Sequence, residues 1–421
     1  MHTILILPFH GFGHFNGLFG VARALEKSHR VVFASTGHFR NHVSSHNFEF
    51  RILTSYPFGL GLEGWIHQVR GTKDPLWRNI VDRWTDRLYH ERVKELTTVL
   101  EELRPVHVLV DAQQATDVVV LKTIDPLLRV SVVSLPPPYL LIPGLPPMNS
   151  TAMPGDCSDA YENSLKAIKA KAWRQKKKYF GMDDRTMVAR RLRRNRMQHL
   201  RDIYPSLITL AVKDVDHYVL TYKEFDFDHE YLHKFNYVGA HPDVRSEEPM
   251  AGEYLQLIAD MKTTGKKIVY CSFGTVPTNR DIKGFLERLD NAIKDLDCFA
   301  IVSSKVRLKS SPMMYVTDWA PQVAVLNACD VFITHGGINS VHDAIRAKVP
   351  MLVYPVDMSY DQNGNSSRVV YHKLGLRGDF DLDTADDIRQ KLKEIFDNKN
   401  NFKSLDISSY PIDSFIKMLV S

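Results

Sequence analysis

Short runs of apolar, largely β-branched residues alternate along this chain with longer segments in which apolar positions recur every three or four residues. The short runs predict buried strands, and the longer segments predict amphipathic helices. The clearest helix is expected between Cys271 and Phe299, where seven apolar side chains fall at helical spacing. Strands that alternate with helices predict an α/β protein with parallel sheets covered on both faces. The expected strands cover residues 3–9, 30–35, 107–110, 130–135, 267–271, 299–303, 331–334 and 351–354.

At 421 residues the chain is longer than one compact core usually supports, so two domains are expected. A segment rich in proline, glycine and charge, residues 239–253, is the best candidate for the linker between them. The two domains are then residues 1–238 and residues 254–408. Residues 409–421 form a separate C-terminal segment with a helical pattern.

The four cysteines are scattered, so neither a disulfide framework nor a zinc site is expected. Met1 leads directly into an apolar strand rather than into a secretion signal. No stretch approaches the roughly 20 apolar residues that are needed to span a bilayer. We therefore expect a soluble, cytoplasmic protein.

The most specific pattern is a block in the second half of the chain that runs from Trp319 to Gln362. It reads WAPQ, then VFITHGGINS, then MLVYP and finally DQ. The middle part predicts a short buried strand, two glycines and the start of a helix. Glycines at a helix entrance let backbone N–H groups approach a ligand closely, and the helix dipole favours an anion there. A diphosphate is the expected ligand of such a site.

This block resembles the signature segment of the family 1 UDP-dependent glycosyltransferases, in particular the bacterial, macrolide-type branch. The resemblance implies the GT-B fold, in which two Rossmann-like domains with parallel sheets face each other across a cleft. It also implies that the first domain binds the acceptor, that the second binds the nucleotide sugar, and that the last helix returns to the first domain. The matching residues are Trp319, Pro321, Gln322, Leu326, Phe332, Thr334, His335, Gly337, Asn339, Ser340, Asp343, Pro350, Pro355, Asp361 and Gln362.

The resemblance also assigns roles in binding the nucleotide. Trp319 is expected to stack on the uracil ring, and Gln322 is expected to reach the base or the ribose. Asp343 stands where the family has a glutamate that binds the ribose hydroxyls, and its side chain is one methylene shorter. The residues implied to hold the diphosphate, in part through their backbone, are His335, Gly337, Asn339, Ser340 and Thr275.

Asp361 and Gln362 match the pair that binds the hydroxyls of the transferred sugar. Two more residues than usual separate this pair from Pro355, which leaves Asp357 as an alternative. Glucose carried by UDP is the expected donor because it is the most frequent one in the family.

A base is needed to deprotonate the acceptor hydroxyl, and an imidazole is suited to this near neutral pH. His14 stands where the family places its catalytic histidine in a Gly-His-x-x-Pro pattern, although Gly17 replaces the proline. Its rival is His10, which more plausibly lines the loop. Asp111 ends the expected strand VHVLVD, where the family keeps the aspartate that pairs with this histidine. Asp117 is the alternative, and we expect it to be a surface or capping residue.

The implied reaction is an inverting transfer of the sugar to a hydroxyl of a small apolar acceptor, with no cofactor and no metal. The segment SLPPPYLLIPGLPPMN is expected to shape the acceptor pocket, with Tyr139 to Ile142 facing an apolar guest. A non-catalytic nucleotide-sugar binder is a weaker alternative, because it would need no base. A dehydrogenase is also weaker: the glycines from Gly11 to Gly17 approach a dinucleotide fingerprint, but the second strand ends RVVFASTGH without an acid.

The strongest concentration of charge lies between Lys166 and Arg201. This segment has fourteen lysines and arginines against two aspartates, a net charge of +12 in a chain whose total is +5. One interpretation is a pair of solvated helices beside the acceptor cleft. The other is peripheral contact with anionic lipid, and with it an enzyme that acts on a lipid or glycolipid acceptor. No nucleic-acid-binding motif accompanies the charge, so no nucleic acid partner is expected.

Overall fold

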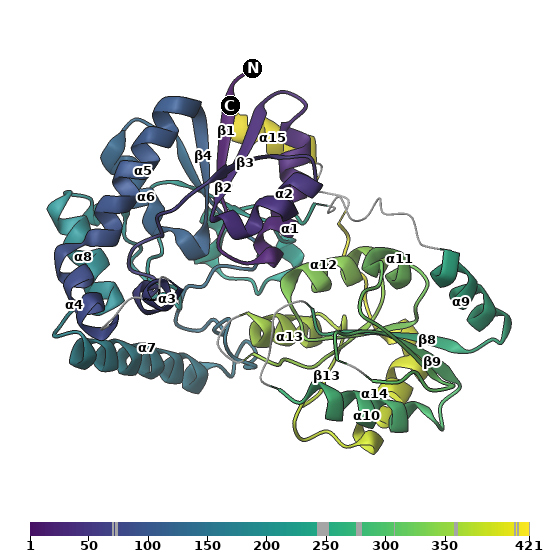
Figure 1. Ribbon diagram of the computed structural model, residues 1–421. Coiled ribbons are helices and arrows are strands. Elements are labelled where there is room, and N and C mark those ends of the chain that lie inside the picture. Colours follow the sequence, from purple (N-terminus) through teal and green to yellow (C-terminus); the bar gives the residue numbers. More distant parts are fainter. Residues whose placement is uncertain are drawn as a thin grey trace.

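The computed structural model describes residues 1–69, 71, 75–241, 252–274, 280–306, 308–357, 361–407, 410 and 412–420. Within these residues the chain forms two parallel sheets, one after the other along the sequence, each flanked by helices (Figure 1). The prediction of an α/β protein with two parallel sheets is therefore confirmed. Of the predicted linker, residues 242–251 lie outside the described part of the chain.

The first sheet has seven strands in the described residues, in the order β3-β2-β1-β4-β5-β6-β7. β1 lies at its centre between β2 and β4, and all five of its residues are buried. Strands buried on both faces read as continuous apolar runs, which is why the central strands could be predicted. The strands are β1 (Thr3–Leu7), β2 (Arg30–Ser35), β3 (Glu49–Ile52), β4 (Pro105–Asp111), β5 (Val130–Ser134), β6 (Asp216–Val219) and β7 (Asn236–Tyr237).

Helices cover both faces of this sheet and extend well beyond it at one end (Figure 1). The basic segment that the sequence singled out forms most of α7 and all of α8. The helices are α1 (Phe12–Leu25), α2 (Arg40–Ser45), α3 (Glu63–Val69), α4 (Pro75–Thr85), α5 (Arg87–Leu103), α6 (Thr116–Ile124), α7 (Ser158–Lys178) and α8 (Asp184–Arg194).

The second sheet has six strands in the described residues, in the order β10-β9-β8-β11-β12-β13. The helix expected between Cys271 and Phe299 is present as α10, and its apolar side chains are buried. The strands are β8 (Lys267–Ser272), β9 (Cys298–Ser303), β10 (Met314–Thr317), β11 (Val331–Thr334), β12 (Met351–Val353) and β13 (Gly375–Arg377). The helices are α9 (Gly252–Thr263), α10 (Ile282–Ile293), α11 (Gln322–Leu326), α12 (Ile338–Ala347), α13 (Gln362–Tyr371) and α14 (Ala385–Asp397).

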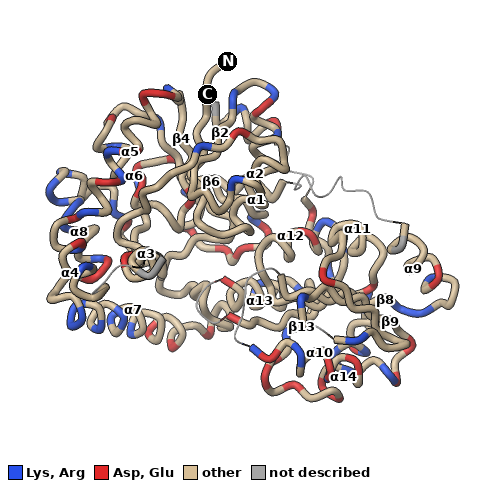
Figure 2. The backbone as a smooth tube through the Cα atoms, viewed as in Figure 1, with Lys and Arg blue, Asp and Glu red and all other residues tan. Residues whose placement is uncertain are grey.

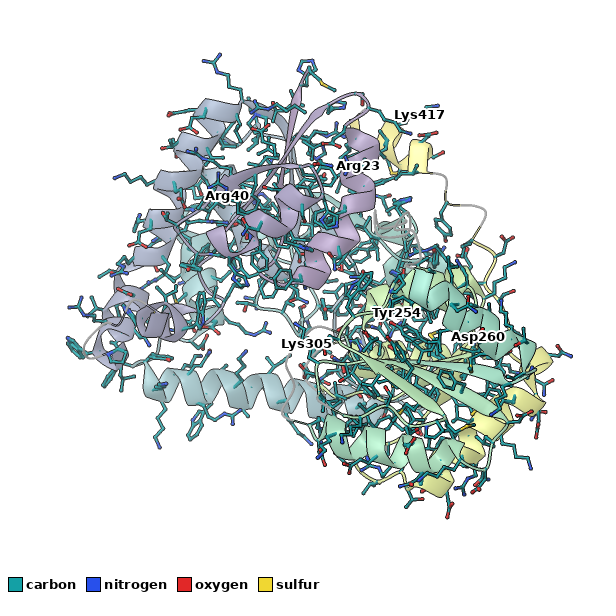
Figure 3. The ribbon with its side chains drawn as sticks, turned by 45° about the vertical axis from the view of Figure 1, so that its right-hand side comes forward. Arg23, Arg40, Tyr254, Asp260, Lys305 and Lys417 are labelled. Carbon is teal, nitrogen blue, oxygen red and sulfur yellow. The ribbon has the colours of Figure 1, made fainter. Side chains whose placement is uncertain are left out.

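The last helix, α15 (Ile412–Val420), packs against the first domain rather than the second. Phe415 and Leu419 are buried there, and the carbonyl of Leu419 lies 3.1 Å from Nδ1 of His107 on β4. Figure 3 shows α15, which carries Lys417, beside the helix α1 that carries Arg23. The two ends of the chain therefore lie close together (Figure 1). None of the helices in the described residues is long and apolar enough to cross a bilayer.

The two halves are held together by apolar and polar contacts. One buried apolar cluster continues from β1 and α1 in the first half into β11 and α12 in the second. Arg368 of α13 donates from Nε and Nη2 to Asp226 of the first half at 2.8 and 2.6 Å, and both side chains are buried. The N–H of Gly364 also donates to the carbonyl of Met148 at 2.8 Å. These contacts fix the loops of one half against those of the other.

Candidate active site

His14 and Asp111 meet at the carboxyl edge of the first sheet. His14 lies in the first turn of α1, which follows β1 directly, and Asp111 is the last residue of the neighbouring strand β4. Nδ1 of His14 and Oδ2 of Asp111 are 2.6 Å apart. Oδ1 of Asp111 accepts the N–H of Gln113 at 2.9 Å, so the carboxylate is held in place from both sides. This edge is where functional groups of parallel α/β sheets usually gather.

The carboxylate sets the protonation of the imidazole. Burial by itself would lower the pKa of His14, but the charge and the hydrogen bond of Asp111, aided by the charge of Asp361, raise it above its ordinary value. A carboxylate at Nδ1 favours the tautomer in which Nδ1–H donates, and this leaves Nε2 free to accept a proton. The His14 side chain keeps 19% of its surface exposed. A reactant could therefore reach it.

The alternatives to His14 and Asp111 were His10 and Asp117, and the surroundings of both indicate structural roles. Burial and the nearby Arg92 lower the pKa of His10 to about 4, so this ring is neutral. Asp117 is fully buried, where it accepts from Nε of Arg92 at 3.1 Å and from Nε2 of Gln114 at 2.9 Å. The expectation that Asp117 is a surface or capping residue is therefore wrong. Because α6 turns it inward, it neutralises a buried arginine instead.

Trp319 presents its indole to solvent, with 54% of its surface exposed. It lies in the loop between β10 and α11, and its carbonyl accepts from the Thr317 hydroxyl at 3.0 Å and from the Tyr254 hydroxyl. Figure 3 labels Tyr254, which α9 brings to this loop. The backbone is thus fixed while the ring stays open, which suits a platform for a flat base.

Gln322 and Asp343 contact each other at 2.6 Å, from Nε2 to Oδ2. Oδ1 of Asp343 accepts from Arg346 on the next turn of α12. The carboxylate of Asp343 therefore accepts from two protein donors, Gln322 and Arg346. Gln322 is the first residue of α11, and its amide nitrogen holds Asp343.

His335 follows β11 in a tight, buried place. Burial lowers its pKa to about 4, which a hydrogen bond with the backbone of Ser272 only partly offsets. The ring is wedged between two glycines, since a Cβ on Gly274 or on Gly337 would come within 2.7 or 2.5 Å of it. Its Nδ1 is buried without a hydrogen-bond partner among the described residues. His335 is thus neutral, and its hydrogen bond with the Ser272 backbone uses the one N–H that a neutral imidazole has.

Gly337 precedes α12, so the free N–H groups of the first turn point out of the loop next to His335. The predicted diphosphate contact of Asn339 is through its backbone, and its side chain has a separate partner, because Nδ2 donates to the carbonyl of Gly13 at 2.7 Å. It ties α12 to the turn that carries His14. Ser340 is half-buried in the same first turn. Thr275, the other predicted phosphate contact, lies outside the described residues.

Asp361 caps α13 on the side of the second domain that faces His14. Burial raises the pKa of Asp361, although the Nδ2 of Asn365 donates to it at 2.9 Å. The charge of Asp361 acts on His14, which shows that the predicted sugar-binding pair lies near the predicted base. Oε1 of Gln362 accepts the N–H groups of Val356 and Asp357, both at 2.9 Å, and so shapes the loop before it.

A model of the family described as "UDP-glucoronosyl and UDP-glucosyl transferase" matches residues 204–417, which is more than half of the chain. The chain belongs to this family. The prediction made from the signature block is therefore confirmed.

Curated relatives match over shorter stretches. The chain is 34% identical over 120 residues to the zeaxanthin glucosyltransferase of Pantoea ananas, which covers 27% of each protein. It is 34% identical over 175 residues to a putative UDP-glucuronosyltransferase, ugt-47, of Caenorhabditis briggsae, which covers 39% of this chain and 31% of that one. These matches span only about a quarter to a third of the relatives' own length.

Solved glycosyltransferases match over the whole length. The glycotransferase of kitacinnamycin has a TM-score of 0.66 at 18% identity, covering 99% of this chain and 94% of that one. The calicheamicin glycosyltransferase CalG4 has a TM-score of 0.62 at 14% identity, covering 100% and 97%. At these identities the likeness concerns the fold, which is GT-B.

Within this family member, sequence reasoning missed Asn365. Its Nδ2 lies 2.9 Å from Oδ2 of Asp361 and 2.9 Å from the carbonyl of Gly336, so it links Asp361 to the glycine turn beside His335. The residue lies one turn after Asp361 on α13, a spacing at which helical side chains meet. That spacing is the signal that could have pointed to it.

Tyr139 and Leu140 of the predicted acceptor lining border a cavity that Ala112, next to Asp111, also lines. Tyr139 to Ile142 are buried, and Leu140 and Ile142 pack with Val219 and Phe227 in a small core of their own. A row of aromatic rings also leads to His14. The ring of Phe9 lies 5.2 Å from that of His14, the ring of His10 lies 5.9 Å from Tyr56, and Tyr56 lies 5.4 Å from Trp65.

Proposed function

We propose that this protein is an inverting glycosyltransferase that moves glucose from UDP-glucose to a hydroxyl group of a small apolar acceptor. The observation that carries the proposal is the 2.6 Å contact between His14 and Asp111, placed where the charge of Asp361 from the other domain acts on it. A nucleotide-sugar binder without activity would need no such pair. Similarity to a zeaxanthin glucosyltransferase supports both the sugar and an apolar acceptor.

In the proposed reaction, Nε2 of His14 takes the proton of the acceptor hydroxyl while Asp111 stabilises the imidazolium that forms. The acceptor oxygen forms a bond to the anomeric carbon. The bond from this carbon to the UDP oxygen breaks, and UDP leaves with the electron pair. Attack opposite to the leaving group inverts the configuration, so an α-linked donor gives a β-glycoside.

The departing diphosphate is proposed to settle at the N-terminus of α12. Free backbone N–H groups and the helix dipole favour an anion there, beside His335. Trp319 holds the base, Gln322 and Asp343 hold the ribose, and Asp361 with Gln362 holds the sugar. Fixed dipoles then do what a divalent metal does in other transferases, and the proposed step requires no metal or other cofactor.

The aromatic row beside His14 supports an apolar, ring-containing acceptor. Trp65 is exposed at one end of the row, and aromatic rings bind flat apolar molecules by stacking. Macrolide-type and phenolic alcohols are therefore the first acceptors to screen.

Asp111→Asn tests the proposed pair through its dependence on pH. His14 acts as a base only when it is neutral, and its pKa is raised, so kcat/KM of the wild type should rise with pH through a value above about 6.5. Loss of the carboxylate charge should move this rise to lower pH. It should also lower the plateau by about 10²–10⁴-fold, the range that general-base catalysis contributes.

The measurement is UDP release from UDP-glucose with a panel of acceptors, in EDTA, over a range of pH. The melting temperature of the variant is the control for folding. An Asp111→Asn profile that overlays the wild type would rule out the pair as the base, and loss of wild-type activity in EDTA would rule out metal-free transfer.

A further inference from the structure

The polar and apolar faces of the helix α4 are reversed relative to those of an ordinary surface helix. Its inner face is mainly polar, because Asn79, Asp82 and Arg83 are buried there beside one apolar residue, Ile80. Its outer face carries Trp77 and Trp84, of which 64% and 48% are exposed, with Val81 between them. Positions 77, 81 and 84 follow the i, i+4, i+7 spacing of a single stripe. Surface helices of globular proteins show the opposite arrangement, and exposed apolar stripes mark contact surfaces.

Buried ion pairs fix this orientation. Nη2 of Arg83 contacts Oε2 of Glu63 at 2.7 Å and Oδ1 of Asp184 at 2.9 Å, and its Nη1 donates to the carbonyl of Met182. Asp82 accepts from Nε2 of His67 at 2.8 Å. A rotation of α4 that buried its tryptophans would leave these charges unpaired, which is costly. The stripe is therefore held toward the outside.

Further aromatic side chains lie on the neighbouring helices. Trp65 of α3, Trp173 of α7 and Phe180 just after α7 are all about half exposed or more. Four of the five tryptophans of the chain are thus on α3, α4 and α7. The end of α7 packs on α4 through Tyr179, whose ring lies 4.1 Å from the guanidinium of Arg83. Figure 1 shows these helices together at one end of the first domain.

Positive charge accompanies the aromatic rings on α7. Lys166, Lys169 and Lys177 lie seven and four residues before and four residues after Trp173, so they share its face, and all three are exposed. None of the three has an ion-pair partner within the described residues. Nζ of Lys177 lies 5.4 Å from the centre of the Trp173 ring. Figure 2 shows the lysines along α7, with acidic residues toward its start.

The arginines of α8 have a different role. Arg190, Arg191 and Arg194 converge on the single buried carboxylate of Asp86, and Arg185 donates to the carbonyls of Ser206 and Ile208. These side chains hold the fold together. The charge that remains available to a partner is therefore mainly that of the α7 lysines.

We propose that the surface formed by α4 and α7 docks on an anionic lipid bilayer. Tryptophan prefers the interface between lipid and water, and lysines next to it are attracted to anionic headgroups. A second copy of the chain would bring the same positive charge to the contact and be repelled. We call this surface the α4–α7 surface; it comprises Trp65, Trp77, Val81, Trp84, Lys166, Lys169, Trp173 and Lys177.

Docking on a bilayer does not depend on the proposed sugar transfer, but it affects how an acceptor would reach the site. Trp65 of the α4–α7 surface contacts Tyr56, and Tyr56 contacts His10, four residues before the proposed base. The surface thus continues toward the side of the site on which the acceptor is proposed to bind. A bilayer at this position would present apolar acceptors dissolved in it.

The test is co-sedimentation of the full chain with vesicles of phosphatidylcholine, with and without roughly 30% phosphatidylserine. The wild type should sediment with the anionic vesicles only, and less so as salt is added. Trp77→Ser/Trp84→Ser should lower the partition coefficient by about tenfold or more, because two interfacial anchors are lost. Lys169→Gln/Lys177→Gln should lower it by a similar factor, and only at low salt.

Matched controls lie in the second domain. Trp319→Ser removes an equally exposed tryptophan, and Lys283→Gln/Lys294→Gln removes two exposed lysines of or next to α10. Neither should change vesicle binding. The assay contains no nucleotide sugar, so its outcome is independent of catalysis.

Three outcomes would overturn the proposal. The first is a wild type that does not sediment with anionic vesicles. The second is vesicle binding that the α4 and α7 variants leave unchanged. The third is binding of RNA or of a second copy of the chain that the same variants abolish while vesicle binding persists.

Discussion

His14→Ala is expected to lower kcat for sugar transfer by about 10²–10⁴-fold. The reason is that the variant keeps the proposed donor site in the second domain and loses the group proposed to take the acceptor proton. His14 is the one histidine of this region whose pKa is raised, through Asp111 and Asp361 against the effect of burial. The dissociation constant of UDP should stay near that of the wild type, because the nucleotide is held by other residues.

Single-turnover transfer and UDP titration together test this prediction. His10→Gln is the matched control, because His10 lies in the same turn but is neutral, its pKa lowered by burial to about 4. It should keep most of the wild-type kcat. Equal losses in the two variants would show that the turn, rather than the imidazole of His14, matters for the reaction.

Arg368→Met is expected to lower the free energy of unfolding by about 3–5 kcal/mol, because it leaves the buried carboxylate of Asp226 without its partner. The guanidinium donates twice to Asp226 and once to the carbonyl of Gly364 at 3.1 Å, and it lies 4.3 Å from the centre of the Phe227 ring. All of these groups belong to the contact between the two domains or flank it. The variant should therefore also unfold in more than one step.

Urea unfolding followed by circular dichroism measures the effect. The exposed pair of Arg30 and Glu49 is the matched control, and Arg30→Met should cost about 1 kcal/mol or less. Arg368→Met/Asp226→Asn removes the unpaired charge and should regain part of the loss. A cost for Arg368→Met no larger than that for Arg30→Met would contradict the assignment of a buried interdomain pair.

The fold could be predicted because its central strands have an unambiguous signal. β1, β8 and β11 are buried on both faces, and such strands require uninterrupted apolar residues. The amphipathic α10 is equally clear. Strands at the edges were missed: three of the four residues of β3 are exposed, and β7 has only two residues. Edge strands have no apolar run that a sequence pattern could reveal.

The candidate site could be predicted where its residues lie in a signature segment or at the ends of neighbouring strands. His14 and Asp111 lie 97 positions apart, yet strand order alone brings them together, since β1 and β4 are neighbours. Other features depend on tertiary contacts that no local pattern specifies. Asn339 is engaged by Gly13, which lies 326 positions away, and Asp117 is turned inward onto Arg92.

The sequence pattern also did not specify which apolar side chains are buried and which are exposed. Tyr139 to Ile142 are apolar and lie in a proline-rich loop, and within it Leu140 and Ile142 pack into a small core while Tyr139 and Leu140 border a cavity. The tryptophans of α4 are apolar too. They are exposed because Arg83 and Asp82 occupy the inner face. Hydrophobicity alone cannot separate these two cases.

The central claim, that the second domain binds UDP for sugar transfer, is tested most directly by thermal stabilisation of the purified protein with UDP, TDP and NAD in EDTA. UDP should raise the melting temperature most, in line with about 2.7 kcal/mol of stabilisation at a ligand concentration of about 100 times its dissociation constant. Trp319→Ala should remove most of the shift, and Trp173→Ala, with a similarly exposed tryptophan, should retain it. Stabilisation by NAD or TDP but not by UDP, or a UDP shift that Trp319→Ala leaves intact, would contradict the account.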